Sequence, residues 1–234
     1  MAILIFLEIP EWLPYVAAIV VISGAIFGIQ TYFAHRRTQA LIPVASQIGF
    51  AFEGKAWSNP QQAPKLTSAL FQMGRGKDFR NIMTGSANGL PVGLFDYAFT
   101  VGGGKSSRTY KQTVFSCVKA GAHLPMFKLW PKDLSHKLWD AMVHKDILFD
   151  THPEFSNRYQ LSGPDETRIR GLFTAGLLSY LETLDKKMKW RIEGNEETLL
   201  VYRSAKKTKP QDFRTFLDET STMAAQFLSL GNWR

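Results

Sequence analysis

A long apolar run near the amino terminus limits how this chain can fold. Residues 12–33 read WLPYVAAIVVISGAIFGIQTYF and contain no charged side chain. As a helix this run would be roughly 33 Å long at ~1.5 Å per residue, which matches the hydrocarbon core of a bilayer. The sequence therefore predicts a single transmembrane helix, with Trp12, Tyr15 and Tyr32 at the two membrane interfaces.

A cleaved signal peptide is the alternative interpretation of this run. A signal peptide begins with a basic segment, but residues 1–11 contain no Lys or Arg,. We therefore expect an uncleaved anchor. Glu8 and Glu11 precede the span, whereas Arg36 and Arg37 follow it. Because positive residues stay on the cytoplasmic side, we expect the amino terminus outside and the rest of the chain inside a bacterial inner membrane.

Two small residues in the span suggest a helix contact. Gly24 and Gly28 form a GxxxG pattern, which lets a second transmembrane helix approach closely,. The alternative is that glycine is simply frequent in spanning helices. The first interpretation predicts other integral membrane subunits as partners.

The remainder of the chain carries all of the excess charge. Residues 1–37 contain two arginines and two glutamates, so the formal charge of +8 lies beyond them. We expect an anchor at 1–37, a juxtamembrane helix and linker at 38–64 with a kink at Pro43, and a cytoplasmic domain at 65–234. Hydrophobic residues make up 45% of the chain, which predicts a packed core in that domain,.

The middle of the chain predicts hairpins. Residues 90–101 and 108–118 alternate apolar and polar side chains around a glycine-rich tip, and Asn88-Gly89 is typical of a tight turn,. Because tight turns outnumber crossover helices, we expect an α+β fold with a mainly antiparallel sheet and packed helices. Further strands are expected at residues 50–52, 78–85, 126–130, 146–150, 159–161, 189–193 and 198–204, the last two joined by a turn at Gly194-Asn195. Helices are expected at residues 39–48, 65–73, 133–143 and 165–184 and after Pro210.

Candidate catalytic chemistry is sparse. The glycine-rich tip lacks the spacing and the following helix of a phosphate-binding loop. Asp150, His152 and Glu154 lie close together in sequence and suggest a metal or catalytic site, although a histidine beside a proline is usually structural,. Cys117 lies among apolar strand residues, which predicts an inert buried thiol. We expect no catalytic residue, metal or cofactor, with a membrane-tethered enzyme of unrecognised class as the alternative.

Exposed and basic residues predict a contact surface. A basic hairpin near the carboxyl end would attract anionic lipid headgroups, and the alternative is a solvated face. The expected partner or lipid contacts are Gly103, Lys105, Lys187, Lys189, Arg191, Lys206, Lys207 and Trp233, with Trp190 beside them. We expect no nucleic-acid partner, because the chain lacks a helix-turn-helix pattern or an RNA-binding signature.

Two segments resemble a known group of proteins. FDYAFTVGGGKSSRTYKQTV (residues 95–114) and DTHPEFSNRYQLSG (residues 150–163) resemble an uncharacterised bacterial family of single-span, membrane-anchored α+β proteins. The resemblance covers most of the chain and implies no activity. In layout, the chain is also similar to accessory subunits of bacterial photosynthetic reaction centre–antenna complexes.

The sequence thus predicts a non-catalytic, membrane-anchored accessory subunit that stabilises a larger membrane protein complex, with a photosynthetic complex as the specific expectation. The alternatives are the tethered enzyme and a sensor of anionic lipid surfaces.

Overall fold

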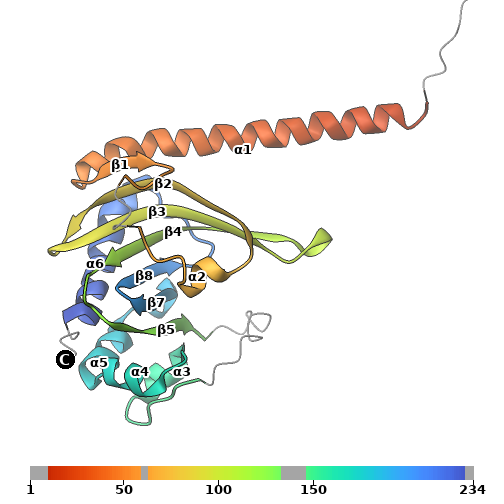
Figure 1. The fold of residues 1–234 in the computed structure, drawn as a ribbon. Helices are drawn as coiled ribbons and strands as arrows, with labels where there is room; N and C mark the ends of the chain where they lie inside the picture. Colours follow the sequence, from red (N-terminus) through yellow and green to blue (C-terminus); the bar gives the residue numbers. More distant parts are fainter. Residues whose placement is uncertain (1–9, 59–62, 133–145, 230–234) are drawn as a thin grey trace, which may run out of the picture. The chain divides into compact units, whose positions relative to one another are not determined.

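The protein has an α+β fold, in which a long apolar helix precedes an antiparallel sheet with packed helices (Figure 1). The computed structural model describes residues 10–58, 63–132 and 146–229. The chain divides into two compact units, Met1–Leu41 and Ile42–Arg234. The predicted span and juxtamembrane helix are one continuous helix, α1 (Leu13–Gln47), which contains Pro43.

The sheet has eight strands, and every pairing in it is antiparallel. Its spatial order is β1-β2-β3-β4-β8-β7-β5-β6. The strands are β1 (Ala51–Gly54), β2 (Arg75–Ala87), β3 (Leu90–Val101), β4 (Arg108–Val118), β5 (Leu124–Pro131), β6 (Tyr159–Ser162), β7 (Trp190–Glu196) and β8 (Thr198–Arg203).

The domain also contains helices, most of them short. They are α2 (Ala69–Gln72), α3 (Pro153–Arg158), α4 (Glu166–Leu172), α5 (Ala175–Thr183) and the longer α6 (Phe213–Ser229), with 3-10 turns η2 (Gly104–Ser106), η4 (Lys186–Met188) and η5 (Pro210–Asp212). Asp165 caps α4, because its Oδ1 accepts a hydrogen bond from the Arg168 amide at 3.0 Å,.

The predicted hairpins of the middle segment are confirmed. β3 and β4 have the predicted bounds, and their register pairs Phe99 with Tyr110. Asn88 and Gly89 join β2 to β3 with φ values of 52° and 73°. Two consecutive positive φ values favour Asn-Gly, which explains why this dipeptide forms the turn.

The sheet buries both of its faces. One face, which we call the α2 face, packs Phe95, Tyr97 and Phe99 of β3 against α2, whose Phe71 ring lies 5.0 Å from that of Tyr97. The opposite face, the α6 face, packs against α6, where the Phe227 ring stacks on Phe127 of β5 at 5.6 Å. Aromatic packing on both faces fixes the helices on the sheet.

Several local predictions are wrong. Residues 146–150 form no strand. The turn between β7 and β8 lies at residues 196–197, because Gly194 and Asn195 continue β7 and pair with β8. Gly194 belongs in the strand because the Phe127 ring packs directly over it and leaves no room for a Cβ atom. The helix predicted at residues 133–143 lies outside the described residues.

Candidate membrane anchor and contact surface

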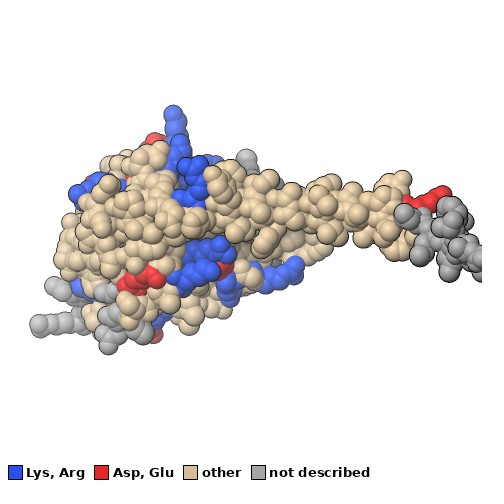
Figure 2. All heavy atoms as spheres, turned by 90° about the horizontal axis from the view of Figure 1, so that it is seen from above, with Lys and Arg blue, Asp and Glu red and all other residues tan. Residues whose placement is uncertain are grey.

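Helix α1 is the main candidate functional element. By length and composition it is the one helix in the described chain that can cross a membrane, and no residue of its apolar run is buried in the protein alone. Figure 2 shows that most of its visible surface carries no Lys or Arg. At ~1.5 Å per residue its 35 residues are roughly 50 Å long, so only part of the helix is needed to cross the hydrocarbon,.

The predicted interface residues of α1 are available for membrane contact. Trp12, Tyr15 and Tyr32 are exposed. The Arg36 guanidinium lies 5.8 Å from the centre of the Tyr32 ring, which places a cation–π pair where the apolar run ends,. Arg37 follows and is half-buried.

Gly24 and Gly28, which lack side chains, lie on one side of the same helix. A Cβ atom at either position would meet no other atom within 4 Å. Nothing in the described residues therefore requires glycine at these two positions. The close contact with another transmembrane helix stays a prediction.

The predicted basic surface is partly wrong. Arg191 is buried in β7, and its guanidinium lies 4.4 Å from the centre of the Trp130 ring. Trp190 is also buried, with its ring 6.0 Å from that of Phe216 in α6. Both side chains belong to the core because β7 is an interior strand of the sheet.

The other predicted contacts are at the surface or undescribed. Lys187, Lys189 and Lys206 are exposed, and Gly103 is exposed at the hairpin tip. Lys207 is half-buried, and its Nζ lies 3.4 Å from Oδ2 of the buried Asp96. Lys105 has its backbone in η2, and Trp233 lies outside the described residues.

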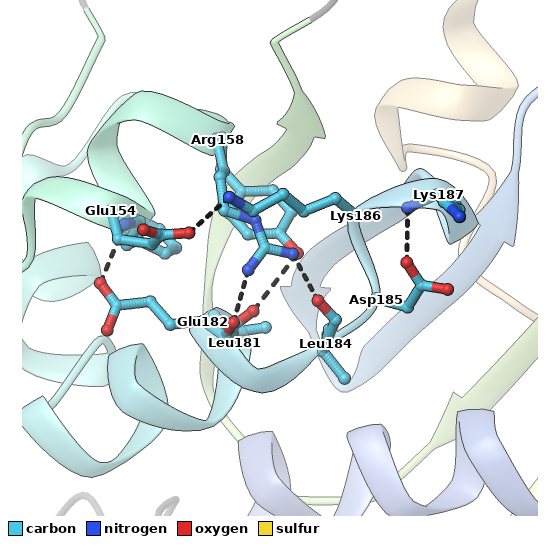
Figure 3. A network of polar contacts seen from close by, with 10 residues as sticks. Glu154, Arg158, Leu181, Glu182, Leu184, Asp185, Lys186 and Lys187 are labelled. Carbon is cyan, nitrogen blue, oxygen red and sulfur yellow. Dashed lines mark hydrogen bonds and ion pairs between the residues drawn. The ribbon is translucent and has the colours of Figure 1, made fainter.

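Glu154 belongs to a network of polar contacts (Figure 3). Arg158 at the end of α3 donates to the Glu182 and Leu184 carbonyls, both at 2.5 Å, and so satisfies the carboxyl end of α5,. The Glu182 carboxylate accepts the Phe155 amide at 2.9 Å, and Glu154 pairs with Lys186 at 2.6 Å. These contacts join α3 to α5, so we interpret the network as structural.

His152 of the predicted Asp-His-Glu site also has local partners. His152 Nδ1 lies 3.0 Å from the Thr151 hydroxyl, and Nε2 lies 3.4 Å from that of Ser179. In the described residues, no group of three or more His, Cys, Asp or Glu side chains could hold a metal ion. The geometry therefore gives the metal hypothesis no support.

Sequence reasoning missed a buried carboxylate on the α2 face. Glu193 of β7 is 2% exposed and accepts hydrogen bonds from the Tyr202 hydroxyl at 2.6 Å and the Leu70 amide at 2.8 Å. Burial raises the pKa of this carboxyl, although these hydrogen bonds and the charge of Arg191 oppose the shift,. The alternation of polar residues in β7 was a usable signal, but it is typical of a solvent-exposed face.

Cys117 is buried as predicted. Burial raises the pKa of its thiol to about 12. A thiol with so high a pKa is a poor nucleophile at neutral pH, which supports the prediction of an inert core residue.

Comparison with known proteins supports the fold. No protein-family model matches the sequence, and no curated protein matches it. Among solved structures, the chain is similar to the crystal structure of the mycobacterial trehalose monomycolate transport factor A, TtfA. The TM-score is 0.53 at 14% sequence identity, and the match covers 83% of this chain and 92% of that one. At this identity the likeness shows a shared fold.

Proposed function

We propose that this protein is a non-catalytic accessory subunit that α1 anchors in a bacterial inner membrane, where it stabilises a complex of integral membrane proteins. The observation that carries the proposal is the exposed, uncharged run of α1 joined to a separately packed α+β domain. An apolar helix of this length is stable in lipid because its backbone groups are satisfied internally.

The flanks of α1 support an orientation. Glu11 precedes the helix, and Arg36 and Arg37 follow its apolar part. The distribution of positive charge supports a cytoplasmic location for the α+β domain. Gly24 and Gly28 then form the surface within the bilayer where a partner helix packs.

The structural neighbour supports the class of partner to look for first. TtfA is named as a trehalose monomycolate transport factor. A complex that contains a membrane transporter is therefore the first candidate. The photosynthetic complex stays a prediction from the layout of the chain alone.

Affinity purification from gently solubilised membranes tests the proposal. The wild-type chain should be recovered from the membrane fraction with a stoichiometric set of integral membrane subunits, which mass spectrometry identifies. Gly24→Leu/Gly28→Leu should remain in the membrane but lose these subunits, because leucine holds the helices apart. Ala18→Leu/Ala25→Leu is the matched control, since it adds similar bulk to the same helix on a different side from Gly24 and Gly28. A wild-type chain that is purified alone, or that alkaline carbonate releases from the membrane, would refute the proposal.

A further inference from the structure

The three longest strands of the sheet end in a protruding ribbon. β2, β3 and β4 have 13, 12 and 11 residues, whereas the flanking β1 and β8 have 4 and 6. β1 pairs with β2 at residues 82–84, and β8 pairs with β4 at residues 114–118. Residues 75–80, 97–101 and 108–112 therefore form a three-stranded end with no further strand beside it in the described chain.

This end of the sheet is strongly basic. Residues 75–80 and 102–111 contain six Lys or Arg residues and a single acidic residue, Asp78. The cations with described side chains are Arg75, Lys77, Arg80, Arg108 and Lys111, and all five are exposed. We call these five residues the basic ribbon. Clusters of Lys and Arg with few acidic residues between them are also visible on the domain in Figure 2.

Three of these cations share one side of the ribbon. The β3 positions that alternate with the aromatic residues of the α2 face point to the α6 face. Arg75, Lys111 and Arg80 pair across the sheet with three such positions, which are Thr100, Ala98 and Asp96. At ~4.8 Å between strands and ~3.3 Å per residue, the three cations lie within roughly 15 Å of one another.

Two carboxylates on the same face, Asp78 and Asp96, compensate part of this charge. Arg80 pairs with Asp78 at 2.5 Å. Arg75 and Lys111 have no ion-pair partner in the described part of the chain. The carboxyl-terminal basic residues differ, because Lys186 pairs with Glu154 and Lys207 pairs with Asp96. Arg75 and Lys111 therefore provide uncompensated positive charge on this face.

The segment that follows α1 packs on the α6 face of the sheet, which also carries the three cations. Phe50 follows α1 and packs against Gly85 of β2, where a Cβ atom would lie 2.5 Å from the Phe50 ring. Gly85 pairs with Val92, which alternates with the α2-face residues of β3 and so lies on the α6 face. The tether and the three cations are thus on one side of the sheet.

We propose that the basic ribbon docks on the anionic headgroups of the leaflet next to which α1 ends. This inference rests on the proposed function, because the anchor keeps the domain at a high effective concentration near that leaflet. A bilayer surface offers a broad layer of negative charge that a flat strand surface can meet with several cations at once. Each unpaired cation near such a surface favours docking by about fivefold, so Arg75 and Lys111 together favour it by roughly 25-fold before screening by salt.

The test uses the full chain in lipid nanodiscs. A fluorophore on Ser107→Cys reports the approach of the hairpin tip to headgroups that carry a quencher, and the buried Cys117 should remain unlabelled. We expect quenching in discs of phosphatidylcholine with phosphatidylglycerol and little in discs of phosphatidylcholine alone. Arg75→Gln/Arg80→Gln/Lys111→Gln should abolish most of the quenching. Lys186→Gln/Lys187→Gln/Lys189→Gln, which removes the same charge elsewhere, should retain it.

Three results would overturn the inference. The first is equal quenching with and without phosphatidylglycerol, and the second is an equal loss in both variants. The third is a ribbon variant that keeps its lipid contact but loses its membrane subunits in the purification, which would make an acidic protein surface the partner. A chain that does not remain in the nanodisc would instead contradict the proposed function, so the two failures are distinguishable. Protection of Cys117 from thiol reagents shows that each variant is folded.

Discussion

Removal of the buried Glu193 carboxylate tests how the α2 face is held together. In Glu193→Ala, the Leu70 amide and the Tyr202 hydroxyl both lose their acceptor inside the core. A buried donor without a partner costs about 1–3 kcal/mol, and the cavity adds to this cost, so we expect a loss of about 3–5 kcal/mol. Glu193→Gln should cost about 1 kcal/mol, because its amide oxygen still accepts from Leu70 and its NH₂ group can donate to Tyr202.

The pH dependence of the free energy of unfolding, compared between the wild type and Glu193→Gln, provides an independent check. Burial raises the pKa of Glu193 in the folded state above its unfolded value. The folded state then binds the proton more tightly, so the stabilising contribution is complete below the unfolded pKa and is lost as the pH rises through the folded pKa. The wild type should therefore lose stability relative to Glu193→Gln as the pH rises, because glutamine does not titrate.

Urea unfolding of the full chain in detergent, followed by tryptophan fluorescence, measures both effects. Glu196→Ala is the matched control on the same strand, where the carboxylate is exposed and pairs with Lys65, and we expect little change,. Tyr202→Phe should destabilise the wild type but have a much smaller effect in the Glu193→Ala background. The reasoning fails if Glu193→Ala unfolds at the wild-type urea concentration, or if the wild type and Glu193→Gln differ by a constant amount across the pH range.

Contacts described above lead us to expect three further experimental outcomes. Arg158→Leu should lower the free energy of unfolding by about 2 kcal/mol, because two carbonyls at the end of α5 lose their donor, and an unchanged urea midpoint would contradict this,. Gly194→Ala should cost about 2 kcal/mol through its clash with the Phe127 ring, whereas Gly176→Ala, which meets no atom, should be neutral or stabilising in the same assay,. Cys117 should react with a thiol reagent only after unfolding, and rapid labelling of the native chain would refute its assigned burial,.

The sequence predicted best where local signals agreed with the tertiary environment. The β3–β4 hairpin has strict alternation and a glycine-rich tip, and both of its strands have the predicted bounds. The prediction of a turn at Gly194-Asn195 is wrong, because the aromatic ring of Phe127, which is distant in sequence, makes glycine necessary within a strand. Local turn chemistry cannot reveal such a contact.

The functional-site residues were also predicted best where the signal is local in sequence. The apolar run of α1 is a property of consecutive residues, so sequence alone is sufficient to locate it. Arg191 was assigned to the surface because arginine is usually exposed, but the Trp130 ring and the interior position of β7 hold it in the core,. The basic ribbon was overlooked because its cations come from two strands that only the sheet register brings together.

The free sides of the β2–β3–β4 ribbon have a consequence for solubility. Strand sides with unpaired amides and carbonyls readily bind the same strand of another molecule, which leads to aggregation. Here charged side chains line these sides, with Arg75, Lys77 and Arg80 on β2 and Arg108 and Lys111 on β4. Mutual repulsion between copies would keep such ribbons apart when many chains crowd one membrane. The same cations that favour an acidic surface would thus also keep the protein from polymerising through its own sheet.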